Sequence, residues 1–387
     1  MPAFLPDATR AGVRAVDPQD LHAVGVPGIV VNTFHLMRGP GTRLIKEAGG
    51  VHRFMGWEGP VVSDSGGFQI YSLIRQNPGS GAIRPNEVIF REPSSGEKLT
   101  LTPERCVQAQ FQLGSDVVMC LDDCTNAEDE PAEQARSVQR TVRWAKRCRA
   151  EFDLLLSRRR PPRSGLRTPD LDQAPRPLLF AVVQGGASEA LRRECAASLA
   201  EIGFDGYGYG GWPLTPDGNL LTDLLQLVAE ATPAGSPLHA LGVGRPDHVV
   251  RAAALGYTIF DCSLPTRDAR HRRLYAFLPD CDPSRPGVSF SPGEPFYETV
   301  YAYDQVHAND FGPLDPTCDC PLCRRHSRAY LRHLFRVEDA TAERLATLHN
   351  LRFYVRLLDA LRRQMAPPEG PPALAAPRPL PSPPLPR

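Results

Sequence analysis

The sequence has no excess of charge of either sign. Its 387 residues include 44 lysines and arginines and 44 aspartates and glutamates, so the formal net charge at pH 7 is zero. Bulk charge therefore gives no indication of a nucleic-acid partner, as a strongly basic domain would. Arginine greatly outnumbers lysine, however, and the arginines gather in local clusters.

Long hydrophobic runs are also missing. No segment is long and apolar enough to span a membrane. Residues 1–14 lack the basic region and apolar core of a secretory signal. Because the chain has ten cysteines without an export signal, we expect a reducing, cytoplasmic compartment. In that setting cysteines bind ligands or pack in the core rather than form disulfides.

The most informative stretch that is present is DSGGFQ at residues 64–69. It follows an apolar segment that is typical of a buried strand, so Asp64 stands where a strand ends. Two glycines let the backbone turn tightly and come close to a ligand, and Phe68 offers an aromatic face. An isolated stretch of this kind is typical of a capped turn. In the context below it indicates a site for a flat, hydrogen-bonding molecule beside an acid or base.

Short apolar segments recur along the chain with helical patterns between them. Seven are predicted to be strands: residues 28–32, 61–64, 116–122, 178–184, 204–211, 239–244 and 258–261. An eighth is expected within residues 298–303. Thr102 and Ser188 are predicted to cap two of the helices, which Gly114 and Gly203 end. Seven or eight such units over roughly 300 residues indicate an α/β fold, a (β/α)8 TIM barrel rather than an open sheet.

Polar residues and one glycine close or directly follow six of these strands. They are Asn32, Asp64, Asp122, Gln184, Gly211 and Asp261. In a barrel the carboxyl ends of the strands form one mouth, where active sites lie. Each residue alone is typical of a cap or turn, but the set at one end of the barrel indicates a shared site.

A cluster of metal-binding residue types lies near the end of the chain. Cys318, Cys320 and Cys323 are closely spaced, and His349 follows after a helical stretch. Three thiolates and one imidazole suit a tetrahedral Zn²⁺ with no open position, which is typical of a structural site. The spacing leaves His326 and His333 as nearer candidates for the fourth ligand, and three buried or redox thiols as the alternative to a metal.

Five motifs resemble those of the tRNA-guanine transglycosylases. They are VNTFHLM at residues 31–37, SDSGGFQ at 63–69, VQGG at 183–186, GVGRP at 242–246 and FDCSLPTR at 260–267. The resemblance runs from about residue 2 to residue 353, in the family's order. It implies a TIM-barrel catalytic domain over residues 1–303 and a zinc-binding subdomain over residues 304–365. It also implies one structural Zn²⁺ per chain, with His349 as the fourth ligand.

Two further segments are expected to lie outside this packed structure. Residues 158–177 contain three successive arginines and several prolines, and are predicted to be an exposed insertion. Residues 366–387 are rich in proline and are expected to form a disordered tail.

The resemblance implies an exchange of the wobble guanine in tRNAs with GUN anticodons for a 7-deazaguanine base. Retained stereochemistry at a ribose requires two displacements. By family match Asp261 is the nucleophile, which forms a covalent ester with the ribose, and Asp64 is the general acid/base.

Recognition of the base follows from its hydrogen-bonding groups. Asp122 can accept from the ring N–H and the amine of guanine, while Gln184 and the Gly211 amide can donate to O6. Ser65 adds a further contact. Phe68 offers a stacking face, worth on the order of 1–3 kcal/mol per base, and Leu241 can pack on the opposite side. Leu241 alone is more typical of a core residue.

Arginines are the expected contacts to the tRNA backbone. By family match Arg245, Arg267 and Arg270 lie near the anticodon phosphates. A second group, Arg324, Arg325, Arg328, Arg332 and Arg336, forms either a basic face beside the zinc site or a solvated surface. The resemblance also implies a homodimer.

Three features depart from the family pattern. The chain starts without the N-terminal segment that closes the barrel bottom in many relatives. Trp212 and Pro213 stand where relatives usually have leucine and a small residue, beside the pocket for the base's substituent. Cys124 is similar to the bacterial enzymes, which favours prequeuosine base (preQ1) over queuine as the substrate.

Three alternative functions remain open at this point. A non-catalytic tRNA-binding paralogue would lack a carboxylate, whereas Asp64 and Asp261 are both present. A DNA-directed 7-deazaguanine transglycosylase is disfavoured by the zinc cluster and the arginines after Asp261. A glycoside hydrolase on a TIM barrel would have no use for Asp122, Gln184 and Gly211.

Overall fold

The computed structural model describes residues 2–91, 96, 98–125, 129–158 and 175–366. Most of the predicted insertion at 158–177 and nearly all of the predicted Pro-rich tail at 366–387 lie outside the described residues, so both stay predictions.

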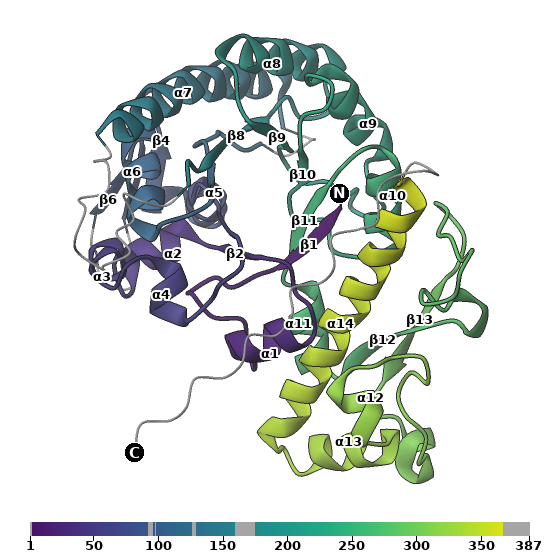
Figure 1. Ribbon diagram of the computed structural model, residues 1–387. Coiled ribbons are helices and arrows are strands. Elements are labelled where there is room, and N and C mark those ends of the chain that lie inside the picture. The colour runs from purple at the N-terminus through teal and green to yellow at the C-terminus, as the bar shows by residue number, and fades with distance from the viewer. Residues whose placement is uncertain (1, 92–95, 97, 126–128, 159–174, 367–387) are drawn as a thin grey trace.

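Eight parallel strands form a closed barrel surrounded by helices, as the sequence predicted (Figure 1). In their order around the barrel they are β1 (Ala3–Pro6), β2 (Ile29–Val31), β3 (Val61–Ser63), β7 (Val117–Met119), β8 (Leu178–Val183), β9 (Gly206–Tyr209), β10 (Leu238–Ala240) and β11 (Ile259–Cys262). β1 pairs with β11 on one side. On its other side, a parallel bridge between Asp7 and Val30 joins β1 to β2 and closes the barrel.

The eighth barrel strand is not where the sequence predicted it. Residues 298–301 belong to β13 (Tyr297–Tyr301), which pairs antiparallel with β12 (Arg273–Phe277) outside the barrel. β13 has one buried residue, Val300, and its other residues are exposed or partly exposed, whereas the strands of a parallel barrel are buried on both faces. β1 is short and almost wholly buried, as a parallel barrel strand must be, and it occupies the eighth position.

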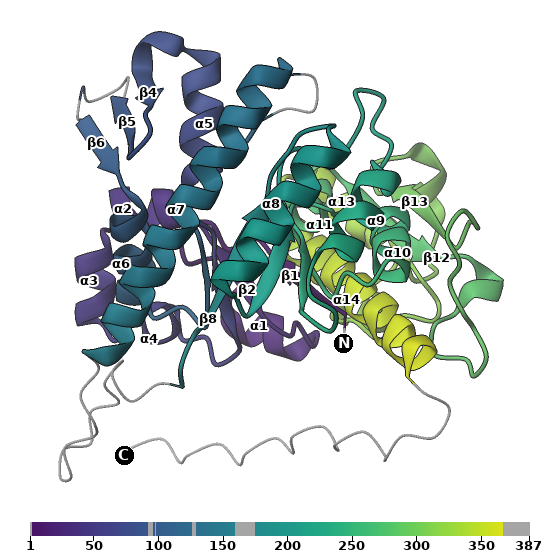
Figure 2. The same ribbon diagram turned by 90° about the horizontal axis from the view of Figure 1, so that it is seen from above.

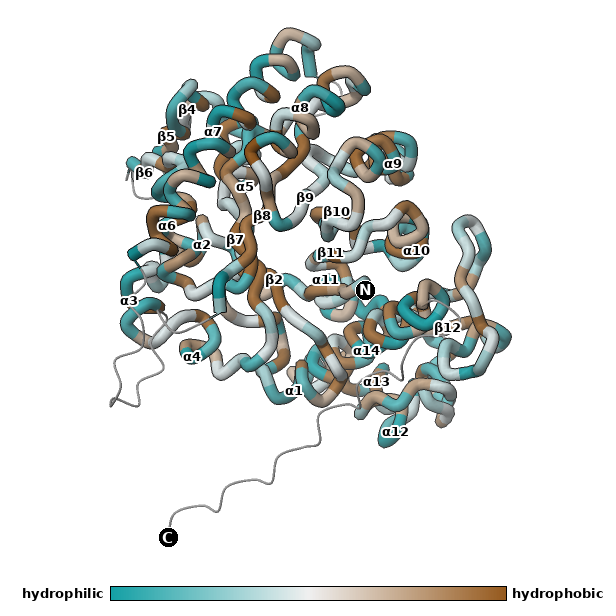
Figure 3. Tube along the Cα trace, turned by 45° about the horizontal axis from the view of Figure 1, so that its top comes forward, coloured by the Kyte–Doolittle hydropathy of each residue, from teal (hydrophilic) through white to brown (hydrophobic). Residues whose placement is uncertain are grey.

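The barrel interior is a packed core rather than a channel. Seven apolar side chains fill it: Leu5, Val30, Val62, Val117, Met119, Phe180 and Val182. Phe180 requires Gly206 beside it, because a Cβ on Gly206 would lie 2.4 Å from the ring. Figure 3 shows hydrophobic residues along the strands and on the helix faces that cover them, with hydrophilic residues outside. This core leaves only the ends of the barrel open to a ligand.

Helices cover the outside of the barrel. They are α1 (Pro18–Ala23), α2 (Thr33–Arg38), α3 (Thr42–Glu47), α4 (Val51–Met55), α5 (Gly67–Gln76), α6 (Pro103–Leu113), α7 (Pro131–Ser157), α8 (Glu189–Ile202), α9 (Thr222–Ala231), α10 (Pro246–Ala254) and α11 (Leu264–Arg270). The predicted caps are confirmed: Thr102 accepts from the Arg105 amide and Ser188 from the Leu191 amide. Gly114 and Gly203 end these two helices with positive φ. No helix in the described part of the chain combines the length and apolar character needed to cross a membrane.

A small antiparallel sheet that the sequence did not predict stands beside the barrel (Figure 2). It consists of β4 (Gly81–Ile83), β5 (Val88–Arg91) and β6 (Lys98–Leu101), and follows α5 and the 3₁₀ turn η1 (Pro78–Ser80). Phe90 of β5 is buried against Phe34 of α2, with ring centroids 6.0 Å apart. The sheet therefore extends the outer core beside the stretch at residues 64–69.

A second unit packs against one side of the barrel. Besides β12 and β13 it contains the 3₁₀ turns η3 (Pro279–Cys281) and η4 (Gln305–Asn309), and the helices α12 (Pro321–Arg325), α13 (Arg328–Arg336) and α14 (Ala340–Met365). Residues of β12, β13, α13 and α14 share one hydrophobic core with the cysteine cluster. α14 also contacts β1 and α11, and so joins this unit to the barrel. The boundary at residue 304 stays a prediction.

Candidate active site and metal centre

A cavity of about 610 Å³ opens at the carboxyl ends of the barrel strands, a size that suits a small-molecule ligand. Nine of the residues predicted to be catalytic, base-binding or tRNA-binding line it: Asp64, Ser65, Phe68, Asp122, Gly211, Leu241, Arg245, Asp261 and Arg267. Gln184 is buried directly behind Asp122. The residues that end or follow the barrel strands therefore lie together at one mouth of the barrel.

Asp64 is held by four hydrogen bonds at the tip of β3. Its Oδ2 accepts from Asn32 Nδ2 at 2.6 Å and from Gln69 Nε2 at 3.1 Å. Its Oδ1 accepts from the amides of Thr33 at 2.8 Å and Gly66 at 3.2 Å. Gly66 has a φ of 75°, and a Cβ there would lie 3.0 Å from the Phe34 amide nitrogen. Gly66 therefore allows the turn to fold back so that its amide donates to the Asp64 carboxylate.

Burial raises the pKa of Asp64 from 3.8 to about 7. Desolvation is the largest cause, because it disfavours the charged form. The amide of Thr33 opposes the shift, and the negative charges of Asp7 and Asp261 add to it. A carboxyl group whose pKa lies near neutrality can both give and take a proton at physiological pH, which is what a general acid/base requires.

Asp261 lies at the carboxyl end of β11 and is held through one of its two oxygens. Oδ1 is 2.8 Å from His239 Nε2 and accepts from the Gly242 amide at 3.1 Å. His239 is fully buried, and its Nδ1 has no hydrogen-bond partner within the described residues. A hydrogen on Nδ1 would be a buried N–H without a partner. We therefore assign the tautomer in which Nε2 donates to Asp261 and orients its carboxylate.

Asp122 presents a hydrogen-bonding edge deep in the cavity, and the buried Gln184 supports it from behind. Gln184 Nε2 donates to Asp122 Oδ2 at 2.7 Å, and the Ser65 hydroxyl donates to Oδ1 at 3.4 Å. Burial raises the pKa of Asp122 to about 6, although the Gln184 contact opposes the shift. At neutral pH Asp122 is still ionised and can accept from a ligand. The buried Gln184 Oε1 has no hydrogen-bond partner within the described residues.

Phe68 and Trp212 face each other at the cavity entrance. Their rings are nearly parallel, with an interplanar angle of 14° and centroids 6.5 Å apart. Both side chains are largely exposed, so they offer flat apolar surface to a ligand. Leu241 lies deeper and packs against the barrel core. It both contributes to the core and forms part of the cavity wall.

The arginines fall into two groups. Arg245 lines the cavity and pairs with Asp247 at 2.8 Å, and exposed Arg267 lies at the mouth. Arg270 is not part of the cavity wall; its Nη1 donates to the Thr266 carbonyl at 2.8 Å. Arg267 stays accessible to a phosphate. By contrast, all three guanidinium nitrogens of Arg245 already donate, two to Asp247 and one to the Gly218 carbonyl.

The second arginine group is only partly a basic face. Arg328 pairs with Asp310 at 2.9 Å and donates to the Leu314 carbonyl at 2.7 Å. Arg332 is buried and donates to the Asp304 carbonyl and the Gln305 side chain. These two therefore hold the subdomain loop together. The exposed members of the group are Arg324, Arg325 and Arg336.

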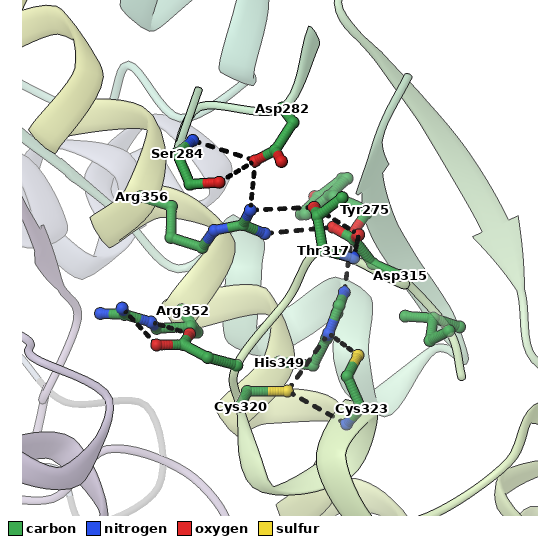
Figure 4. A network of polar contacts seen from close by, with 12 residues as sticks. Tyr275, Asp282, Ser284, Asp315, Thr317, Cys320, Cys323, His349, Arg352 and Arg356 are labelled. Atoms are coloured by element: carbon green, nitrogen blue, oxygen red, sulfur yellow. Dashed lines mark hydrogen bonds and ion pairs between the residues drawn. The ribbon is translucent and has the colours of Figure 1, made fainter. Parts of the chain in front are cut away.

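Cys318, Cys320, Cys323 and His349 converge in the second unit. Figure 4 shows His349 facing Cys320 and Cys323. One ligand atom from each lies within 4.8 Å of the others. His349 Nδ1 is 3.5 Å from Cys320 Sγ and 3.3 Å from Cys323 Sγ, while Nε2 lies 2.7 Å from the Tyr275 carbonyl oxygen. That carbonyl fixes the tautomer with Nδ1 free for a metal. His326 instead stacks on Tyr330, so the histidine that joins the three cysteines is His349.

This donor set fits a closed tetrahedral metal site. Three sulfurs and one imidazole suit Zn²⁺, and four protein ligands leave no position for a substrate. None of the four residues belongs to the wall of the cavity at the barrel mouth. The cluster therefore lies apart from the cavity that Asp64 and Asp261 line.

The structure adds positions that the sequence patterns did not reveal. Asn32 was singled out as a strand-ending residue, but its bond to Asp64 was not foreseen. His239 and Gln69 were not identified as orienting groups, and Asp7 was not identified as a residue of the mouth. His239 could have been found, because it lies two residues before Leu241 in a predicted strand and so faces the same side.

The comparisons with known proteins agree with this site. A family model described as "Queuine tRNA-ribosyltransferase" matches residues 1–368. The queuine tRNA-ribosyltransferase of Pseudoalteromonas translucida (strain TAC 125) is 38% identical over 368 residues, which cover 94% of this chain and 86% of the relative. That of Lysinibacillus sphaericus (strain C3-41) is 37% identical over 361 residues, with 93% and 84% covered. That of Thermoanaerobacter sp. (strain X514) is 36% identical over 361 residues, with 93% and 85% covered.

Proposed function

The chain belongs to the queuine tRNA-ribosyltransferase family, a family of pentosyltransferases, and from this premise we propose its reaction. The enzyme exchanges the wobble guanine of tRNAs with GUN anticodons for a 7-deazaguanine base. One observation carries this proposal: Asp64 and Asp261 share one cavity with the hydrogen-bonding edge of Asp122, which the buried Gln184 supports. A glycoside hydrolase would need the two carboxylates but not that edge.

Asp261 is the nucleophile in the first displacement. Because His239 and the Gly242 amide both contact Oδ1, Oδ2 remains available to attack C1′ of the ribose. The C1′–N9 bond breaks and its electron pair leaves with guanine. Protonated Asp64 supplies the proton that makes the departing base neutral, and itself becomes a carboxylate. A ribosyl ester of Asp261 remains, with the RNA strand intact.

The second displacement runs in the opposite sense. A 7-deazaguanine base takes the place of guanine, and the Asp64 carboxylate removes its N9 proton. N9 attacks C1′, the ester bond breaks, and Asp261 recovers its charge. Two inversions give overall retention. Asp64 ends protonated as it began, so the cycle consumes no cofactor. With carbon in place of N7 the product base cannot be protonated there, which makes it a poorer leaving group than guanine.

The cavity recognises the shared edge of both bases. Asp122 accepts from the ring N–H and the amine, and Gln184 and the Gly211 amide donate to O6. Ser65 supports Asp122, and the base lies between Phe68 and Leu241. Gly211 is suited to this role because its φ of 89° turns its backbone in a way other residues avoid.

The preferred incoming base is prequeuosine base rather than queuine. Trp212 places a large indole at the entrance, and the compact aminomethyl group of prequeuosine base leaves more room beside it than queuine does. In a competition assay we expect the smaller base to be incorporated faster. Trp212→Gly should narrow the difference, and faster incorporation of queuine by the unaltered enzyme would reverse this assignment.

Arg245, Arg267 and Arg270 are proposed to hold the anticodon phosphates while the target nucleotide leaves its stack. Binding to the RNA backbone should weaken steeply as the salt concentration rises.

Because its proposed partner is tRNA, the enzyme is proposed to act in the cytoplasm. It is also proposed to be a homodimer. Exposed Val306, Phe311 and Tyr330 on the subdomain are side chains that an interface can cover.

We propose one structural Zn²⁺ per chain at the Cys–His cluster, and its removal is expected to destabilise the protein. Cys320→Ser should lose the metal and lower the melting temperature by about 5 °C or more, because metal binding contributes folding free energy. Cys281→Ser changes a half-buried cysteine outside the cluster and should keep both. The readouts are metal content and thermal unfolding, and full zinc content in Cys320→Ser would contradict the ligand set.

The reaction itself is tested by base exchange. Unmodified tRNA with a wobble guanine is incubated with radiolabelled guanine and the zinc-loaded protein. Label should enter the tRNA, whereas the same tRNA with adenine at that position should take up none. A folded, zinc-loaded enzyme that incorporates no label would exclude the proposal and favour a non-catalytic tRNA-binding paralogue.

A further inference from the structure

A third carboxylate, Asp7, lies in the cavity between the two proposed catalytic carboxylates. In the register of β1 and β11, Leu5 pairs with Asp261. The Leu5 side chain fills the barrel interior, and alternate residues of a strand face the same side. Asp7 therefore continues the inward-facing row one level higher, and it does line the cavity. Around the rim the order is Asp261 on β11, Asp7 after β1, Asn32 after β2 and Asp64 after β3.

The Asp7 side chain is held in place and still has capacity to accept hydrogen bonds. The Thr9 hydroxyl lies 2.7 Å from Oδ1 and 2.8 Å from Oδ2, so a single hydrogen is shared by both oxygens. The backbone beside it is fixed by the Ala8 amide, which donates to the Val30 carbonyl at 2.7 Å. A carboxylate can accept about four hydrogen bonds. No lysine or arginine among the described residues forms an ion pair with Asp7.

Asp7 is close enough to both proposed catalytic carboxylates to affect their charge. Burial raises its pKa, with the Thr9 hydrogen bonds opposing the shift and the charge of Asp261 adding to it. Its own charge in turn contributes to the raised pKa of Asp64. A bound cation does not explain why Asp7 lies near Asp64 and Asp261. Within the described part of the chain, the Cys–His cluster is the one group close enough to share an ion.

We propose that Asp7 accepts a hydrogen bond from the 2′-hydroxyl of the target ribose, and thereby makes the enzyme prefer RNA to DNA at the reacting nucleotide. The proposal rests on the proposed function, in which Asp261 attacks C1′. The 2′-hydroxyl is on the carbon next to C1′, so it is held beside the nucleophile, where the neighbouring strand presents Asp7. A carboxylate is the usual partner of a ribose hydroxyl in nucleotide-binding sites, and the 2′-hydroxyl is what distinguishes RNA from DNA.

The test uses two anticodon stem-loop RNAs that differ at one atom. One carries guanosine at the wobble position and the other 2′-deoxyguanosine. Single-turnover rates of adduct formation are measured for the unaltered enzyme, Asp7→Ala and Asp7→Asn. Asp153→Asn, an exposed carboxylate on the outer helix α7, is the matched control. Because the deoxyribose is intrinsically different in reactivity, the quantity compared is the ratio of the two rates in each protein.

In Asp7→Ala the rate with the ribose substrate is expected to fall about 10- to 100-fold, since a hydrogen bond to a charged group is lost. The rate with the deoxyribose substrate should change little, so the ratio of the ribose rate to the deoxyribose rate should fall by the same factor. Asp153→Asn should keep the ratio of the unaltered enzyme. Melting curves and zinc content confirm that each variant is folded.

Two results would overturn the proposal. An equal loss with both substrates would show that Asp7 does not contact the 2′-hydroxyl. An unchanged ratio with a shifted pH dependence in Asp7→Asn would show that Asp7 acts only through the charge of Asp64. Failure of the proposed function is distinguishable from both, because the unaltered enzyme would then form no adduct with either RNA.

Discussion

Asp261→Asn should form no covalent RNA adduct and should lose base exchange by at least about 10⁴-fold, as expected when a nucleophile is removed. An amide oxygen is a poor nucleophile, and the asparagine has no charge to balance the developing oxocarbenium ion. The Gly242 amide can still donate to the side-chain oxygen, so the fold of the site should persist. The measurement is denaturing gel electrophoresis of enzyme incubated with unmodified tRNA, together with the rate of labelled guanine incorporation.

The matched control for this substitution is Asp153→Asn on the outer surface of the barrel. It makes the same chemical change far from the mouth and should form the adduct at the normal rate. An adduct that persists in Asp261→Asn, with the protein folded and zinc-loaded, would assign the nucleophile to another residue.

The second large effect concerns Asp64 and depends on pH. With its pKa raised to about 7, Asp64 is protonated below that pH and ionised above it. The first half-reaction needs the acid to protonate guanine, so adduct formation should slow as pH rises through about 7. The second half-reaction needs the base to deprotonate the incoming 7-deazaguanine, so it should slow as pH falls through the same value.

Asp64→Asn should remove both pH dependences and slow each half-reaction by about 10²- to 10⁴-fold, the usual contribution of a general acid or base. The half-reactions are separated by trapping the adduct first and adding the 7-deazaguanine base afterwards. If both half-reactions depend on pH in the same direction, one residue does not serve as acid in one step and base in the other.

Much of the barrel and its mouth could be predicted because the relevant signals are local. Each buried strand is a short apolar run, and Asp64, Asp122 and Asp261 each stand at or just after the end of one. The cysteine spacing likewise restricts three ligands to one turn. Such patterns depend on residues close in sequence, whose relative placement follows from strand and helix geometry.

The features of the fold and site that were not predicted depend on contacts between segments far apart in the sequence. β1 was not identified because Pro2 and Pro6 stand around its few apolar residues, and proline argues against an interior strand. Only its place between β11 and β2 makes it the eighth strand. The contact between His239 and Asp261 forms only because β10 and β11 are paired in the observed register. The engagement of Arg332 with the Asp304 carbonyl could not be read from its charge, which is equally typical of a solvated surface.

The most direct test of the central claim is to locate the covalent bond. Enzyme trapped on an anticodon stem-loop RNA is denatured at acidic pH to preserve the ester, digested with protease and nuclease, and its peptides are sequenced by mass spectrometry. The account predicts a ribosyl group on Asp261, in strand β11. A ribosyl group on Asp64 or Asp7, or on no residue at all, would contradict it.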